Sequence, residues 1–88
     1  MPEVARFRGI IITMYYADPV RHSVAHFHAR YSGNQASFTI EPPSWLAGMM
    51  PRRQIQIILG WAELRNDELQ ENWRRLQTGE PLNKIEGV

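Results

Sequence analysis

The feature that most constrains the fold is a run of alternating polar and apolar residues between positions 26 and 40. Residues 26–31 read His-Phe-His-Ala-Arg-Tyr, residues 32–34 have the Ser-Gly-Asn composition of a tight turn, and residues 35–40 alternate again. This pattern predicts a β-hairpin. Because side chains alternate across a strand, the core face would carry Phe27, Ala29, Tyr31, Ala36, Phe38 and Ile40. The opposite, solvated face would carry His26, His28, Arg30, Gln35, Ser37 and Thr39.

The regions on either side of this hairpin complete the predicted sheet. Residues 7–16 are β-branched and aromatic, which predicts one buried strand that ends before Pro19. Residues 18–25 are expected to form a loop, the Glu-Pro-Pro sequence at 41–43 to end the hairpin, and residues 44–50 to form a loop or turn. The N-terminal half is therefore expected to form a three-stranded, mainly antiparallel sheet.

The C-terminal half has helical periodicity from Pro51, which suits the first position of a helix. An apolar stripe follows this period: Ile55, Leu59, Ala62, Leu69, Trp73 and Leu76. Asn66 interrupts the stripe, so the region forms either one long helix or two consecutive helices. We favour two, with Asp67 as the cap of the second and Gln70 completing a capping box, because one long helix would overhang so small a sheet.

The helical region is expected to end at residues 78–81, followed by an extended tail that docks through Leu82 and Ile85. Gly60 lies inside the first helical segment, where glycine is unfavourable, so we expect it to mark close packing. The sequence as a whole predicts a single α+β domain over residues 1–88, with the helices packed on the sheet.

The composition excludes several classes of protein. The absence of cysteine excludes disulfides and thiolate zinc sites. A net charge of +1 does not indicate a nucleic-acid partner, although it does not exclude RNA. No apolar run approaches the roughly 20 residues of a membrane-spanning helix, so no membrane association is expected. The first residues lack the pattern of a secretion signal, which favours the cytoplasm.

The candidate functional residues lie in the hairpin. His26 and His28 are two residues apart on one strand face, a spacing that suits two ligands of one metal ion. A third ligand would have to come from His22, Asp18 or Glu41. Arg30 on the same face argues against a metal, because a fixed cation repels a dication. We therefore expect no cofactor, and the metal site is only one alternative to a solvated strand face.

The same face also suits phosphate chemistry. Histidine titrates near neutrality and can exchange a proton with a ribose hydroxyl, and Arg30 could bind a phosphodiester through two hydrogen bonds. Tyr15, Tyr16 and Tyr31 could stack on bases, although core positions are the simpler interpretation. The Trp45–Met50 segment could cover the core or form an interaction patch, while the arginine pairs at 52–53 and 74–75 suit a solvated helix surface.

Motifs along nearly the whole chain resemble a small bacterial family described as a domain of unknown function. They are Met1-Pro2, Arg6-Phe7-Arg8-Gly9-Ile10, Met14-Tyr15-Tyr16-Ala17-Asp18, residues 26–31, Trp61-Ala62-Glu63-Leu64, Glu71-Asn72-Trp73 and residues 79–85. The sequence departs from the family pattern before the histidines, where Val24 and Ala25 replace a usual proline and the longer loop adds His22. Members of this family are often encoded beside a second small protein, as in toxin–antitoxin pairs, and some are labelled DhiT-type toxins.

The resemblance implies that this chain is the toxin-like component of such a module, bound by a small antitoxin-like protein. It nominates His26, His28, Arg30 and Tyr31 as candidate catalytic residues. The first alternative is a non-enzymatic interaction or homodimerisation module. A further alternative is a small RNA-cleaving or metal-binding protein that uses the face formed by His26, His28 and Arg30. Whether the protein is an enzyme stays open at this point.

Overall fold

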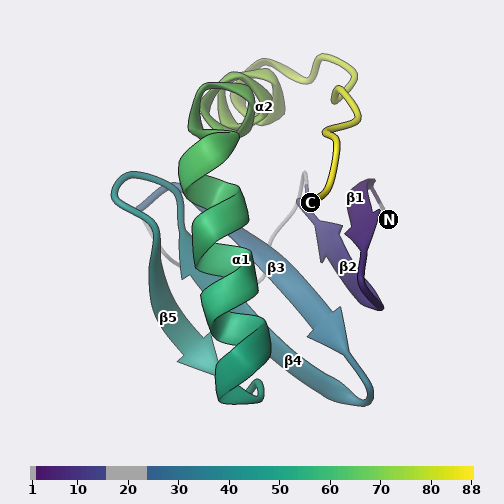
Figure 1. The fold of residues 1–88 in the computed structure, drawn as a ribbon. Coiled ribbons are helices and arrows are strands. Elements are labelled where there is room, and N and C mark those ends of the chain that lie inside the picture. Colours follow the sequence, from purple (N-terminus) through teal and green to yellow (C-terminus); the bar gives the residue numbers. More distant parts are fainter. Residues whose placement is uncertain (1, 16–23) are drawn as a thin grey trace.

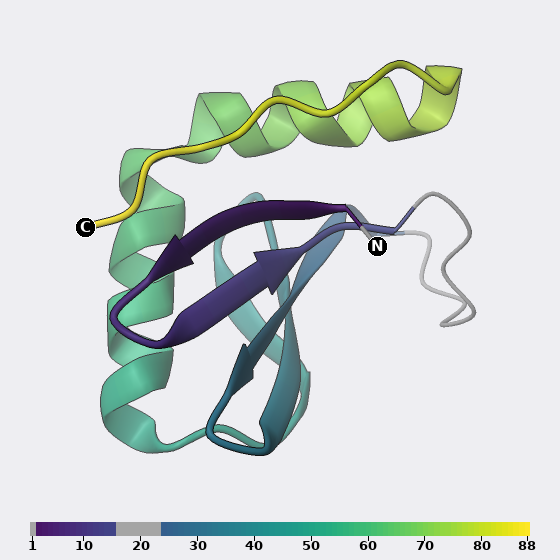
Figure 2. The same ribbon diagram turned by 90° about the vertical axis from the view of Figure 1, so that its right-hand side faces the viewer.

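The computed structural model describes residues 2–15 and 24–88. Its elements are, in chain order, β1 (Glu3–Phe7), β2 (Ile10–Thr13), β3 (His26–Tyr31), β4 (Asn34–Thr39), β5 (Ser44–Gly48), α1 (Arg52–Leu64) and α2 (Asn66–Thr78). The strands form one antiparallel sheet in the order β1-β2-β3-β4-β5. Helix α1 runs along one face of this sheet, and α2 turns away from α1 across the end of the sheet (Figure 1, Figure 2). The predicted α+β class is confirmed.

The predicted hairpin is present as β3 and β4, with the register that the alternation requires. Phe27 lies opposite Phe38 and Ala29 opposite Ala36, and all four side chains are buried. The turn between the strands places Ser32 and Gly33 at φ 47° and 82°. Two consecutive residues with positive φ are typical of a two-residue turn whose twist matches that of the flanking strands.

The prediction of three strands was wrong, because the sheet has five. The expected single strand over residues 7–16 is a second hairpin instead: β1 begins at Glu3, and the chain turns at Arg8 and Gly9, which have φ of 51° and 76°. A turn of this type normally has asparagine, aspartate or glycine at its first position. Because Arg8 occupies that position here, the sequence did not indicate a turn.

The fifth strand was also missed. Residues 44–50 were expected to form a loop or turn, but β5 pairs with β4 along Ser44–Gly48. Its sequence does not alternate, and a register shift between Ser37 and Phe38 interrupts the pairing. A bulged edge strand of five residues gives little periodic signal, since alternation along so short a strand is easily lost.

The core lies between the sheet and α1. Trp61 of α1 is fully buried, with its ring 5.1 Å from Phe7 and 5.7 Å from Phe27. Phe27 in turn stacks on Phe38 at 5.5 Å. These rings join the N-terminal hairpin, the central hairpin and the first helix into one apolar cluster. Within the described residues, neither helix is long and apolar enough to cross a membrane.

The C-terminal region contains two helices, as we favoured, but the predicted cap is wrong. The helical region is interrupted at Arg65, and no side-chain hydrogen bond caps the N-terminus of α2. Asn66 instead donates from its amide to the carbonyl oxygens of Ile40 and Ala62 at 2.5 and 3.2 Å, and it accepts a bond from Gln70. A polar side chain on the apolar stripe is thus explained by its bond to the end of the sheet. Gly60 is exposed with no atom near its missing side chain, so the close packing predicted there is also wrong.

The expected docking of the C-terminal tail is confirmed. Figure 2 shows the tail running back alongside α2 towards β1. Ile85 is buried, and its backbone N–H donates to the carbonyl oxygen of Val4 in β1 at 2.8 Å. The buried Asn72 side chain makes bonds of 2.9 Å to both the N–H and the C=O of Asn83. The tail therefore covers the β1 side of the sheet.

Candidate functional site on the outer face of the sheet

The antiparallel register brings several of the predicted candidates together on the face of the sheet that is turned away from α1, here called the outer face. His28 lies opposite Ser37, and Arg30 lies opposite Gln35. His28 and Arg30 are both half-buried, and Gln35 is exposed. The hairpin thus gathers an imidazole, a guanidinium, an amide and a hydroxyl group within two neighbouring strands.

The outer face is not the fully solvated surface that the alternation predicted. The His26 side chain is only 3% exposed and that of Ser37 only 6%. The His26 ring lies 5.3 Å from Trp73 of α2, and its Nδ1 atom is 2.9 Å from the carbonyl oxygen of Val24. The expectation failed because α2 covers this end of the sheet, a contact between distant segments that strand periodicity does not contain.

His28 continues this row of rings. Its ring lies 5.3 Å from His26 and 4.9 Å from Tyr15, both in edge-on contacts. Trp73, His26, His28 and Tyr15 therefore form a chain of contacts from the buried end of β3 to the open part of the outer face. In this arrangement His26 is the buried member of the histidine pair, and His28 is the member that reaches the open part of the outer face.

Arg30 has an unusual environment. Its Nε atom is buried and has no hydrogen-bond partner among the described residues. The pKa of the nearby Glu3 carboxyl is lowered chiefly by its hydrogen bond from Arg6, with Arg30 contributing only a weaker charge interaction. A half-buried cation without a paired anion is costly, since burial removes water without supplying a counter-charge.

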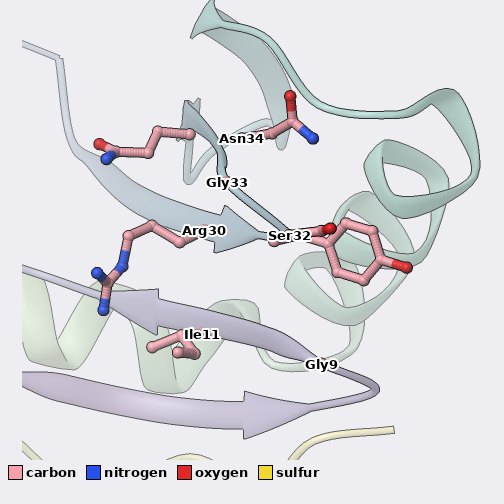
Figure 3. A pocket seen from close by; sticks show the side chains of 8 residues that line it. Gly9, Ile11, Arg30, Ser32, Gly33 and Asn34 are labelled. Atoms are coloured by element: carbon pink, nitrogen blue, oxygen red, sulfur yellow. The ribbon is translucent and has the colours of Figure 1, made fainter.

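A hollow of about 260 Å³ lies on one side of Arg30, towards the two hairpin turns (Figure 3). Figure 3 shows Arg30 extending from β3 over the neighbouring β2, where Ile11 occupies the opposite register position. The residues that line this hollow are Gly9, Ile11, Arg30, Tyr31, Ser32, Gly33, Asn34 and Gln35.

A second hollow, of about 200 Å³, lies on the other side of Arg30, towards β5. Its lining consists of Tyr15, His28, Ala29, Arg30, Gln35, Ala36, Ser37, Ala47 and Gly48. Arg30 and Gln35 belong to both linings, so the two hollows meet at these side chains. No described residue in either lining is acidic.

Gln35 and Ser37 were placed on this face by the sequence but were not nominated as functional residues. Their position opposite Arg30 and His28 in the hairpin register was the signal that could have identified them. Tyr31, which was nominated, lies beside the β1–β2 turn: a side chain added at Gly9 would come within 3.3 Å of its ring. Tyr31 also packs against the core cluster, although it contributes to the lining of the first hollow.

A metal site has little support among the described residues, which contain no group of three side chains able to hold an ion. Glu41 therefore does not join His26 and His28 as a third ligand. The other candidates, Asp18 and His22, lie outside the described residues, as do Tyr16, Pro19 and most of the loop expected at 18–25.

A third hollow, of about 400 Å³, has a different electrostatic character. It lies between α2 and the strand ends, with Val24, Ala25, Ile40, Glu41, Gln70, Trp73, Arg74 and Gln77 as its lining. Its arginine is compensated, because Arg74 pairs with Glu71 at 2.7 Å and with Glu80 at 3.0 Å. These bonds raise the pKa of Arg74 and help to lower the pKa of both carboxyls. Arg74 is thus held by two carboxylates, whereas the described residues that line the hollows beside Arg30 include no acid.

Comparison with known proteins identifies one family. Residues 9–74, which include the outer-face residues and both helices except the end of α2, match DUF4160, a domain of unknown function. No match was found among curated proteins or among solved structures. The match covers well over half of the chain, and the chain therefore belongs to the DUF4160 family.

Proposed function

We propose that this chain is the toxin-like component of a bacterial two-gene module, and that its outer face binds an anionic phosphate group of the target. The observation that carries the assignment of an anionic ligand is Arg30, a half-buried guanidinium with an unpartnered Nε atom between two hollows whose described lining residues include no acid. A phosphate oxygen would supply the missing counter-charge, and the planar guanidinium suits its geometry.

The neighbouring side chains support the same assignment. Gln35 and Ser37 add uncharged hydrogen-bonding groups, so the site can contact several oxygens of one phosphate. His28 adds an imidazole, a side chain that can act as a general acid or base, to the lining of the hollow towards β5. If the bound group is a phosphodiester of RNA, His28 is placed to exchange a proton with the reacting oxygens, which would make the toxin a metal-free ribonuclease.

The experiment is inducible expression of the chain alone in a bacterial host, compared with co-expression of the small protein encoded beside it. Growth arrest that is relieved by the neighbouring protein supports the proposal. Arg30→Gln should abolish the arrest, whereas Arg53→Gln, a change at an exposed arginine outside both hollows, should leave it intact. Normal growth with the wild-type chain alone, or arrest by Arg30→Gln, would overturn it.

Self-association is a second candidate, favoured by the exposed apolar side chains around β5. Trp45 is 49% exposed and Met49 is 68% exposed, beside an uncharged strand that lies at one edge of the sheet. Uncharged edges are poorly protected against pairing, and two antiparallel copies of β5 could pair about a two-fold axis. The Trp45 indole, however, already donates to the carbonyl oxygens of Ala47 and Gly48 in the same strand.

Light scattering on the purified chain tests this candidate. A dimer that dissociates in Met49→Lys, but persists in Leu64→Lys, would place the contact at β5. Leu64 is the matched control, because it is 74% exposed at the end of α1. A monomer at high micromolar concentration would remove self-association from consideration.

A further inference from the structure

The outer face has a shape that narrows the class of phosphate ligand, and this inference rests on the proposed function of the same site. We infer that the ligand is single-stranded nucleic acid, bound at one internal phosphodiester by Arg30. The essential observation is that a hollow lies on each side of this arginine and that the two share Arg30 and Gln35.

A terminal phosphate would use this arrangement poorly. It carries one substituent, so a ligand held at Arg30 would fill one hollow and leave the other empty. An internal phosphodiester carries a nucleoside on each side, which matches a cation between two hollows. Each hollow, at about 260 and 200 Å³, is also smaller than the roughly 300–1,000 Å³ of ordinary small-molecule pockets.

The two hollows differ in ways that orient the ligand. The one towards β5 contains Tyr15, whose ring is held by its edge contact with His28, and this ring offers a surface for one base. The one towards the turns is lined by small and polar side chains, with glycine at positions 9 and 33. This hollow suits a sugar and a loosely held base, so stacking is expected on one side of the phosphate only.

The charge of the protein explains why its composition gave no sign of such a ligand. The net charge is +1, and both arginines of the 74–75 pair are engaged by Glu71. A single phosphate contact releases few counterions, so the affinity should depend only weakly on salt. For single strands the slope of log K against log salt is about −0.7 for each phosphate neutralised. We therefore expect a slope near this value, and a slope near zero in Arg30→Gln.

The test is a nuclear magnetic resonance titration of the full chain, in which the buried Nε–H of Arg30 serves as the reporter. The probes are inorganic phosphate, uridine monophosphate, the dinucleoside monophosphate UpU and its deoxy counterpart dUpdU. UpU should bind about tenfold more tightly than inorganic phosphate, because stacking of one base is worth that much. It should also bind more tightly than the mononucleotide, although it carries less charge, because only UpU fills the hollows on both sides of Arg30. The comparison of UpU with dUpdU distinguishes ribose from deoxyribose, because the two probes share their bases and their internal phosphodiester.

Two variants separate the contributions. Tyr15→Leu should reduce the affinity for UpU while leaving that for inorganic phosphate unchanged, and Arg53→Gln should change neither. Circular dichroism on each variant confirms that it is folded. The inference is overturned if the mononucleotide binds as tightly as UpU, in which case phosphate binding, and with it the proposed function, survives. If no probe shifts the Arg30 resonance, both fail together.

Discussion

Arg30 and Gln35 lie directly opposite each other in the antiparallel register of β3 and β4, and both side chains line both hollows of the outer face. The pairing places an amide group beside a guanidinium that has no acidic residue among its described neighbours in the two linings. The register is fixed by the apolar residues on the other face, Phe27 and Phe38, because a slip of one residue would turn them towards water. Packing in the core therefore determines the geometry of the site.

Core and site residues should respond to mutation in opposite ways. Phe27→Ala should lower the free energy of unfolding by about 3–5 kcal/mol, because it leaves a cavity against Trp61 and Phe38. Arg30→Gln should change it by less than about 0.5 kcal/mol or raise it, because the native Nε has no partner to lose. Urea denaturation measures both. A loss in Arg30→Gln as large as that in Phe27→Ala would mean that Arg30 is a structural residue.

Replacement of the two histidines of β3 by alanine should change stability to different extents. His26→Ala should destabilise the chain by at least about 1 kcal/mol, because its ring is buried against Trp73 and such aromatic contacts contribute that much. His28→Ala should cost less, because the ring is only half-buried. The same denaturation assay tests the difference. Equal losses would contradict the assignment of His26 to the packed part of the sheet and of His28 to the open site.

The tail contact gives a prediction with an internal control. Asn72→Ala should lower the free energy of unfolding by about 1–3 kcal/mol, because it leaves the Asn83 backbone groups without partners. Asn83→Ala keeps those backbone groups, so its effect should stay within about 0.5 kcal/mol. Thermal unfolding of the two variants tests this prediction. A larger loss of stability in Asn83→Ala than in Asn72→Ala would contradict a contact formed through the Asn83 backbone.

Two glycine substitutions should have opposite signs. Gly60→Ala should stabilise the chain by about 1 kcal/mol, since the site is exposed and alanine is the better helix former. Gly48→Ala should destabilise it, because φ is +85° and the added carbon would meet the Gln35 carbonyl oxygen. Melting temperatures suffice to compare them. Destabilisation by Gly60→Ala would indicate that something packs there after all.

The ion pairs of α2 predict a dependence on pH. The pKa of Glu71 is lowered chiefly by its hydrogen bond from Arg74, and that of Glu80 by Thr78 and Arg74. A carboxyl whose pKa is lower in the folded state stabilises the fold above its unfolded pKa, near 4.5, and this contribution is lost as the pH falls through the folded value. Arg74→Gln should therefore reduce the loss of stability below pH 4.5. The measurement is the urea concentration at the midpoint of unfolding as a function of pH. If this dependence is the same in Arg74→Gln and in the wild type, the exposed ion pairs contribute nothing measurable to stability.

Local patterns account for the parts of the fold that were predicted from sequence. The alternation of residues 26–31 and 35–40 is sufficient to define β3, β4 and their register, and the position of Gly79 marks the end of α2. The turn at Arg8 was hidden because arginine is not a usual residue at positive φ, and β5 was hidden by its bulge.

Contacts between distant segments account for the remaining differences. His26 was expected on a solvated face because nothing in its own strand signals that Trp73 of α2 packs on it. The chemistry of the outer face was visible in the sequence as His28 and Arg30. Their pairing with Ser37 and Gln35, and the two hollows that meet at Arg30, could be recognised only from the assembled sheet.

The central claim is that Arg30 binds a phosphate group, and titration of the isotope-labelled chain with inorganic phosphate at neutral pH and low salt tests it most directly. The account predicts a saturable shift of the Arg30 Nε–H resonance, accompanied by shifts of Gln35 and Ser37, that weakens as sodium chloride is added. Shifts confined to the exposed Arg52 and Arg53, with Arg30 unchanged at phosphate concentrations that saturate those shifts, would contradict the account.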